Sequence, residues 1–270
     1  MPNYAWATDI HLDFLKEDTQ RLIAFAESLI KRNPTGIFLT GDLSVAPQLV
    51  YHLSAIERVV QRPVYFVLGN HDFFGGQVEE VRKRMRELSN MSGFLRYMPT
   101  MPYYALTPST AVVGHDGWYD AHYGDWQGSS FTMVDWKAIH DFRQVNGNKA
   151  TIVAQSRKMA HEGVLHVQEG IKKAARYHKN IVILTHFPPF AESHIHQGEL
   201  GDIHAMPWFT SKMMGDMLRA ASAAYPGHTF TVLAGHTHGK YEGKITSNLR
   251  VLVGGAEYDR PELQGLVEVL

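Results

Sequence analysis

The 270-residue sequence contains no cysteine. Disulfide bonds and metal sites built on thiolates, such as structural zinc sites, are therefore excluded. The start of the chain, MPNYAWATDIHLDF, also lacks the basic region followed by an apolar stretch that is typical of a secretory signal peptide. We therefore expect a cytoplasmic protein, although a mature secreted form whose signal peptide has been removed would look the same.

Excess charge of either sign and long apolar runs are missing as well. Lys and Arg total 26 against 27 Asp and Glu, so the formal net charge is −1. This balance provides no electrostatic attraction for duplex nucleic acid or an anionic membrane. No apolar run approaches the roughly 20 residues of a membrane-spanning helix. We therefore expect neither a nucleic acid nor a membrane as a partner.

Histidine, in contrast, is abundant, with 16 residues. Short, continuous apolar runs predict strands that are buried on both faces. These runs are Tyr4–Thr8, Gly36–Thr40, Val64–Leu68, Ile181–Thr185 and Thr229–Ala234. Helical patterns lie between the strands, at Asp18–Arg32, Pro47–Gln61, Gln77–Ser89 and Ala150–His178. The alternation predicts parallel β-α-β units. The last thirty residues read as antiparallel strands around a Ser247-Asn248 turn, and no linker is visible, so we expect one α/β domain over residues 1–270.

Each of the five predicted strands is followed by residue types that bind metal ions. They are Asp9 and His11, then Asp42, then Asn70 with His71 and Asp72, then His186, and finally His236 and His238. The carboxyl ends of the strands form the edge at which open α/β sheets bind ligands. Five such ends in succession predict a metal centre at that edge.

These motifs resemble those of the calcineurin-like metallophosphoesterases over residues 9–238. The matching residues are Asp9-Ile10-His11, Gly41-Asp42, Gly69-Asn70-His71-Asp72, His186 and Gly235-His236-Thr237-His238. The resemblance implies two mixed β-sheets packed as a sandwich and flanked by helices, in four layers. It also implies hydrolysis of phosphate monoesters or diesters by a metal-bridging hydroxide at a two-metal centre.

The resemblance also assigns the ligands. It gives Asp9, His11 and His238 to the first metal and Asn70, His186 and His236 to the second, with Asp42 bridging both. A mixture of carboxylate, amide oxygen and imidazole suits transition metals better than Ca²⁺ or Mg²⁺. We expect Mn, Fe or Zn, with Ni and Co as alternatives.

His71 and Asp72 are the predicted catalytic residues. In the family that the motifs resemble, the histidine beside the asparagine ligand stabilises the phosphoryl group or protonates the leaving oxygen. We expect Asp72 to hydrogen-bond the ring of His71.

Two differences from the motifs of related enzymes argue against two classes of phosphatase. Protein serine/threonine phosphatases of this family follow the bridging aspartate with valine and Asp-Arg-Gly, whereas Asp42 is followed by Leu43, Ser44, Val45 and Ala46. The missing arginine argues against a protein phosphatase. Purple acid phosphatases carry a tyrosine ligand where Val45 stands, so an iron–tyrosinate centre is not expected.

Two loop segments, 115–131 and 187–209, are candidates for contact with the substrate, and neither contains Lys or Arg. Nucleic-acid binding depends largely on such cations, so their absence argues against a DNA nuclease and leaves a small phosphoester. Trp118, Tyr119, Tyr123 and Trp126 could line a pocket or anchor the first loop. His194, His196 and His204 are open candidates in the second.

The favoured interpretation is a dinuclear-metal phosphohydrolase that acts on small phosphomonoesters or phosphodiesters. A nucleotide or cyclic-nucleotide phosphodiesterase is the rival within enzymes. A non-catalytic interaction protein on the same fold is the alternative from another class, and the seven filled ligand positions argue against it. The sequence leaves the oligomeric state open.

Overall fold

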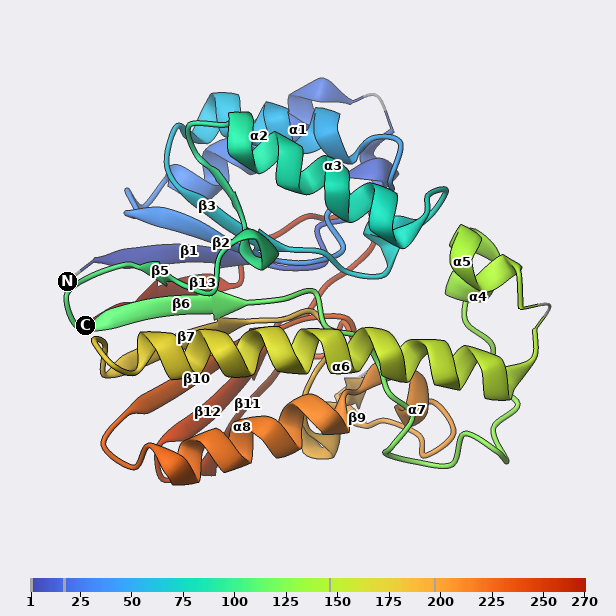
Figure 1. Ribbon diagram of the computed structural model, residues 1–270. Coiled ribbons are helices and arrows are strands. Elements are labelled where there is room, and N and C mark those ends of the chain that lie inside the picture. Colours follow the sequence, from blue (N-terminus) through green and yellow to red (C-terminus); the bar gives the residue numbers. More distant parts are fainter. Residues whose placement is uncertain (1, 17, 146, 197) are drawn as a thin grey trace.

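Two β-sheets lie face to face at the centre of the computed structural model, which describes residues 2–16, 18–145, 147–196 and 198–270 (Figure 1). The first sheet has the order β13-β1-β2-β3-β4, and the second has the order β11-β12-β10-β7-β6-β5. The first consists of β1 (Asn3–Ala7), β2 (Gly36–Thr40), β3 (Val64–Val67), β4 (Leu95–Tyr97) and β13 (Gly265–Glu268). The second consists of β5 (Tyr104–Ala105), β6 (Thr110–Gly114), β7 (Asn180–Leu184), β10 (Thr229–Ala234), β11 (Tyr241–Thr246) and β12 (Leu249–Val253). A small separate hairpin pairs β8 (Ile195–His196) with β9 (Glu199–Leu200).

Helices cover the outer face of each sheet, which confirms the predicted four-layer sandwich (Figure 1). The first sheet is covered by α1 (Thr19–Ile30), α2 (Leu49–Val60) and α3 (Val78–Met91). The second is covered by α6 (Lys149–Ala174) and α8 (Lys212–Ala224). Short helices in the connections are α4 (Asp135–Ala138), α5 (His140–Arg143) and α7 (Met206–Phe209). Single 3₁₀ turns are η1 (Leu12–Leu15), η2 (His71–Phe73), η3 (Met98–Thr100) and η4 (Ala191–Ser193).

The continuous apolar runs are explained by burial on both faces of each strand. In β2, Ile37 and Leu39 pack against the helices, whereas Phe38 packs between the sheets and stacks on Tyr4 at 4.6 Å. In β7, Ile181 and Ile183 likewise pack against the helices, whereas Val182 and Leu184 pack between the sheets. Because successive side chains of a strand point to opposite faces, an apolar run in these strands supplies both layers of the core.

All five predicted strands form, with bounds that differ by at most one residue. The order β1-β2-β3 is parallel, and so is β12-β10-β7-β6. Asp18 caps α1 as predicted, since its Oδ1 accepts the N–H of Arg21 at 3.0 Å. The predicted hairpin forms between β11 and β12. Helix α2 begins after Pro47 rather than with it, and α6 ends at Ala174 rather than at His178.

The carboxyl ends of the parallel strands face the end of the molecule opposite the two chain termini (Figure 1). Helices α4, α5 and α7 gather at this same end (Figure 1). Within the described residues, the helices are too short or too polar to cross a membrane. The fold therefore brings the predicted ligands and the long connections between β6 and β10 to one edge.

Candidate metal centre

Five of the seven predicted metal ligands have a left-handed backbone. The φ angles of Asp9, His11, Asp42, His236 and His238 are 50°, 40°, 51°, 72° and 58°. Residues other than glycine rarely adopt this conformation, and it persists where the surrounding structure enforces it, most often at functional sites. Five of the ten non-glycine residues with positive φ in the described part of the chain thus lie where the motifs place the metal centre.

The first group of ligand atoms lies at the ends of β1 and β10. The Nε2 atoms of His11 and His238 are 3.1 Å apart, and His238 Nε2 is 3.5 Å from Asp9 Oδ1. His11 Nε2 also lies 3.9 Å from Asp42 Oδ2. One donor atom from each of these four residues falls within 4.8 Å of the others, which is a spacing that a single metal ion can occupy.

The second group shares Asp42 with the first. His186 Nε2 is 3.4 Å from Asp42 Oδ1 and 3.3 Å from Asn70 Oδ1. Asp42, His186 and His236 also have donor atoms within 4.8 Å of one another. One oxygen of Asp42 therefore faces each group, which is the arrangement expected of a bridging carboxylate.

The ligands of the second group are fixed from behind by hydrogen bonds. His186 Nδ1 donates to the carbonyl of Thr40 at 2.8 Å, and His236 Nε2 donates to the carbonyl of Trp208 at 3.2 Å. Asn70 Nδ2 donates to Asp135 Oδ1 at 2.8 Å. A donor on one side of an imidazole or amide leaves the lone pair of the other side free for a metal ion. These residues therefore fit a metal centre.

Thr40, Trp208 and Asp135 were missed by the sequence reasoning, because no motif marks them. Burial raises the pKa of Asp135 to about 6, with the Asn70 hydrogen bond acting in the opposite direction.

The histidines around Asp42 favour the ionised form of its carboxyl group. Burial alone would raise the pKa of Asp42, but His186, His71 and His11 hold it well below its usual range. Burial would lower the pKa of His186, yet the Asp42 carboxylate raises it to about 9. A histidine must be neutral to bind a metal ion, so binding at His186 expels a proton.

Glycines beside the ligands leave no room for a side chain. A Cβ atom on Gly69 would lie 2.1 Å from Asp42 Oδ1 and 2.5 Å from the Asp42 backbone nitrogen. A Cβ atom on Gly235 would lie 2.1 Å from Asp9 Oδ2. The glycines of the motifs are thus required by the close approach of ligand side chains.

We expect Gly69→Ala to destabilise the protein by about 1–3 kcal/mol, since overpacking of a tight site forces backbone shifts. The displaced Asp42 should also hold fewer metal ions. Gly93→Ala is the matched control, because a Cβ there has no neighbouring atom within 4 Å. Urea unfolding and metal analysis of both variants check this. Equal stability and metal content for the two would contradict the packing argument.

His71 lies beside the site but is not held by Asp72. The ring of His71 stacks on Phe74 with centroids 4.3 Å apart, and its Nε2 is 4.0 Å from Asp42 Oδ2. Asp72 instead accepts the backbone N–H groups of Leu43, Ser44 and Gly69 at 2.8–2.9 Å. The structure thus corrects the predicted pairing of Asp72 with the ring of His71: Asp72 joins the turns after β2 and β3.

The aromatic residues of the 115–131 segment favour the anchoring role over a role in lining a pocket. Trp118 and Tyr119 are fully buried and pack with Phe187 and other core rings, so they anchor the loop. Tyr123 lies under the ammonium group of Lys212 at 5.8 Å, and Trp126 is partly buried against the core. The anchoring role therefore holds for Trp118 and Tyr119, the two fully buried rings of this segment.

A cavity of about 540 Å³ adjoins the second group of ligands. Its wall includes Thr237, which lies between two ligands, and Phe209, whose ring packs 4.8 Å from that of His236. His194, stacked on Phe209, and the exposed His196 also line it. Its described lining holds Glu199 and Asp202 and includes neither Lys nor Arg. The 187–209 segment thus forms a pocket beside the site.

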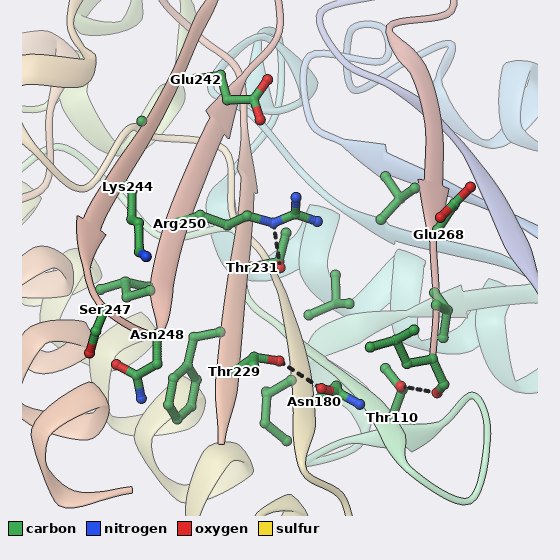
Figure 2. A pocket seen from close by; sticks show the side chains of 18 residues that line it. Thr110, Asn180, Thr229, Thr231, Glu242, Lys244, Ser247, Asn248, Arg250 and Glu268 are labelled. Carbon is green, nitrogen blue, oxygen red and sulfur yellow. Dashed lines mark hydrogen bonds between the residues drawn. The ribbon is translucent and has the colours of Figure 1, made fainter. Parts of the chain in front are cut away.

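Another cavity, of about 520 Å³, lies at the opposite end of the second sheet (Figure 2). Asn180 and Thr229, the first residues of β7 and β10, form part of its wall. Figure 2 shows Glu242, Lys244 and Arg250 on β11 and β12 of the second sheet and Glu268 on β13 of the first. The predicted ligands follow the other ends of these strands, so we place the chemistry at the ligands and not in this cavity.

Tyr258 is a further residue that the sequence reasoning missed. Its ring centroid lies 4.7 Å from that of His11 and 4.9 Å from that of His238, and 48% of the residue is exposed. Arg21 anchors its turn by donating to Asp259 Oδ1 at 2.8 Å. The segment after β12 therefore places a phenol over the first group of ligands.

Comparisons with known proteins agree with this geometry. The family model described as calcineurin-like phosphoesterase matches residues 3–240. Among solved structures, phosphopantetheinyl hydrolase from Mycobacterium tuberculosis aligns with a TM-score of 0.66 at 15% identity, covering 94% of this chain and 89% of that chain. A dimetal phosphatase from Danio rerio aligns with a TM-score of 0.58 at 12% identity, covering 94% and 87%.

GAP50, the anchor in the inner membrane complex of Plasmodium, also aligns, with a TM-score of 0.51 at 13% identity over 94% of this chain and 71% of that chain. A search of curated protein sequences found no match. At these identities the solved structures show a shared fold, and they confirm the predicted sandwich.

Proposed function

The chain belongs to the calcineurin-like phosphoesterase family, and on this premise we propose that it hydrolyses small phosphomonoesters or phosphodiesters at two transition-metal ions. It is a metal-dependent phosphoesterase. The observation that carries the proposal is Asp42, with one oxygen facing each of two groups of ligands. We also propose that residues 1–270 form one domain, since a single apolar cluster joins residues Tyr4 to Val269 between the sheets.

In this proposal, Asp9, His11 and His238 hold the first ion, Asn70, His186 and His236 hold the second, and Asp42 bridges them. Their mixture of carboxylate, amide and imidazole donors favours Mn, Fe or Zn. Two ions in such a site bind the phosphoryl oxygens and lower the pKa of a bound water.

The chain's own residues supply the remaining parts of the reaction. His71 lies next to the bridging carboxylate and is partly open to solvent, with 16% of its side chain exposed. A ring N–H of His71 can therefore reach the oxygen that leaves the phosphorus and give it a proton. Asp72 holds the turn that carries His71, and Tyr258 closes the other side of the first group.

The cavity beside His236 supports a small substrate whose leaving group carries no further phosphate. A second anionic group would meet Glu199 and Asp202 without a neutralising cation in the described lining. The rings of Phe131 and Phe209, 5.6 Å apart in an edge arrangement, offer an apolar surface. This surface also suits the neutral base of a nucleoside monophosphate or a cyclic nucleotide, which is the second candidate substrate class.

A non-catalytic role, such as an anchor on the same fold, is the less favoured alternative. Seven filled ligand positions, of which three are oriented from behind, are costly to maintain without a metal ion. Purified protein should accordingly contain about two transition-metal ions per chain. A chain with none would favour the anchor.

We expect small phosphoesters to be hydrolysed far better than single- or double-stranded DNA. Cations that contact the 115–131 segment are already engaged. Arg157 donates to the carbonyl of Asp120 and Lys149 donates to that of Ser129, while Lys212, which lies over Tyr123, pairs with Asp216. Assays at low salt, where electrostatic binding of DNA is strongest, check this by comparing kcat/KM. A higher kcat/KM for DNA would contradict the proposed substrate class.

A further inference from the structure

The amide of Asn70 has two ends of similar shape, and only one of them can bind a metal ion. The oxygen carries lone pairs, whereas the NH₂ group is a donor alone. We infer that Asp135 is a positioning residue for the second metal: its carboxylate accepts the Asn70 Nδ2–H and so turns the amide oxygen toward His186 Nε2. This inference rests on the proposed assignment of Asn70 as a ligand of that metal.

A carboxylate is suited to orienting the Asn70 amide. The 2.8 Å bond joins two side chains that are each at least 98% buried, so water does not compete for the amide. The oxygens of a carboxylate accept hydrogen bonds, and the reversed amide would direct its own oxygen at Asp135 Oδ1 and leave that acceptor without the amide donor. Asparagine or alanine at position 135 would lose this discrimination.

The main chain fixes Asp135 independently of Asn70. The α4–α5 segment is joined to the turn after η2 by two backbone hydrogen bonds: Gly75 N–H donates to Ala138 O at 2.9 Å, and His140 N–H donates to Gly76 O at 3.0 Å. In addition, Asp141 Oδ2 accepts the N–H of Val78, the first residue of α3, at 2.9 Å. Asp135 is therefore held in place before it meets the amide.

Helix α4, which carries Asp135, also supports His236 through the neighbouring residue Trp136. The ring of Trp136 packs edge-on against Trp208 at 5.1 Å, and the carbonyl of Trp208 accepts the Nε2–H of His236 at 3.2 Å. Asp9 of the first site is instead held by the hydroxyl of Thr8 and the backbone N–H of His236, and neither of these groups contacts Asp135. A change at Asp135 should therefore act on one of the two ions.

The test is a titration of metal-free protein with Mn²⁺ against a competing chelator, together with electron paramagnetic resonance. Asp135→Asn keeps the size of the side chain, and circular dichroism checks its fold. We expect one of the two ions to bind about 10–100-fold more weakly, as is typical for loss of an outer-shell partner. The spectrum should change from that of a coupled pair to that of an isolated ion.

Two further variants separate orientation from packing. Asp141→Asn removes a carboxylate that docks the same segment without touching a ligand, and both ions should remain. Asp135→Glu disturbs the packing more than asparagine does but keeps an acceptor, so it should retain the second ion better than Asp135→Asn.

The inference is overturned if Asp135→Asn binds both ions as tightly as the wild type, or if it loses both together. Equal losses in Asp141→Asn, or a loss in Asp135→Glu as large as that in Asp135→Asn, would also overturn it. A wild-type protein that binds fewer than two ions would reject the proposed function, and this inference with it.

Discussion

Asp42→Asn should lower the occupancy of both metal sites at once. Asp42 faces His11 through one oxygen and His186 through the other, so both ions lose an anionic ligand. In the wild type, Asp42 Oδ1 accepts the backbone N–H of His71 at 2.9 Å. Asparagine has the same shape and can still accept this hydrogen bond, so the turn that contains His71 should keep its structure. The fall in kcat/KM should exceed the roughly 10–100-fold typical of an outer-shell change.

A matched control is available in Asp120→Asn. Asp120 is also fully buried and accepts the backbone N–H groups of His122 and Met213, but it is not one of the proposed ligands. Metal analysis and kcat/KM should be close to wild type for this variant. If Asp42→Asn kept two ions and full activity, the bridging role would be rejected.

The ligand positions were predictable because they follow from strand ends. The apolar runs that end at Thr8, Thr40 and Leu68 have both faces buried, and parallel pairing brings their carboxyl ends to one edge. Residue types at those ends then indicated Asp9, Asp42 and Asn70 as candidates, and the family resemblance proposed them as ligands. Local patterns were sufficient for this part of the fold and of the site.

The residues that hold the ligands could not be read from local patterns. Asp135 lies 65 positions from Asn70, in a connection whose four-residue helices carry no periodic signal. Tyr258 reaches His11 from a segment that lies beyond the family match. Such contacts depend on how long loops pack, which is a tertiary outcome.

The correction at Asp72 has a local physical reason. The backbone of the turns after β2 and β3 presents three N–H groups that have no strand partner, and a buried N–H group requires an acceptor. Asp72 satisfies them. The ring of His71 is placed by stacking on Phe74 instead.

Because His71 lies beside the proposed ligands without being one of them, His71→Gln should lower kcat/KM by an amount that depends on the leaving group. An alkoxide leaves poorly without a proton, whereas a nitrophenolate leaves readily. Loss of a general acid typically costs about 10²–10⁴-fold in rate. We therefore expect a loss in this range in kcat/KM for an alkyl phosphate and a much smaller loss for a 4-nitrophenyl phosphate. Metal content should not change, because His71 is not among the proposed ligands.

The competing role for His71 is electrostatic, as a cation that binds the phosphoryl oxygens. Both esters share the phosphoryl group, so both would then slow by similar factors. Asp72→Asn supplies the contrast: it weakens the hydrogen bonds that hold the turn, and it should slow both esters alike and lower stability, since removing an acceptor leaves buried N–H groups unpaired. Equal losses for both esters in His71→Gln would reject the proton-donor role while leaving the metal centre intact.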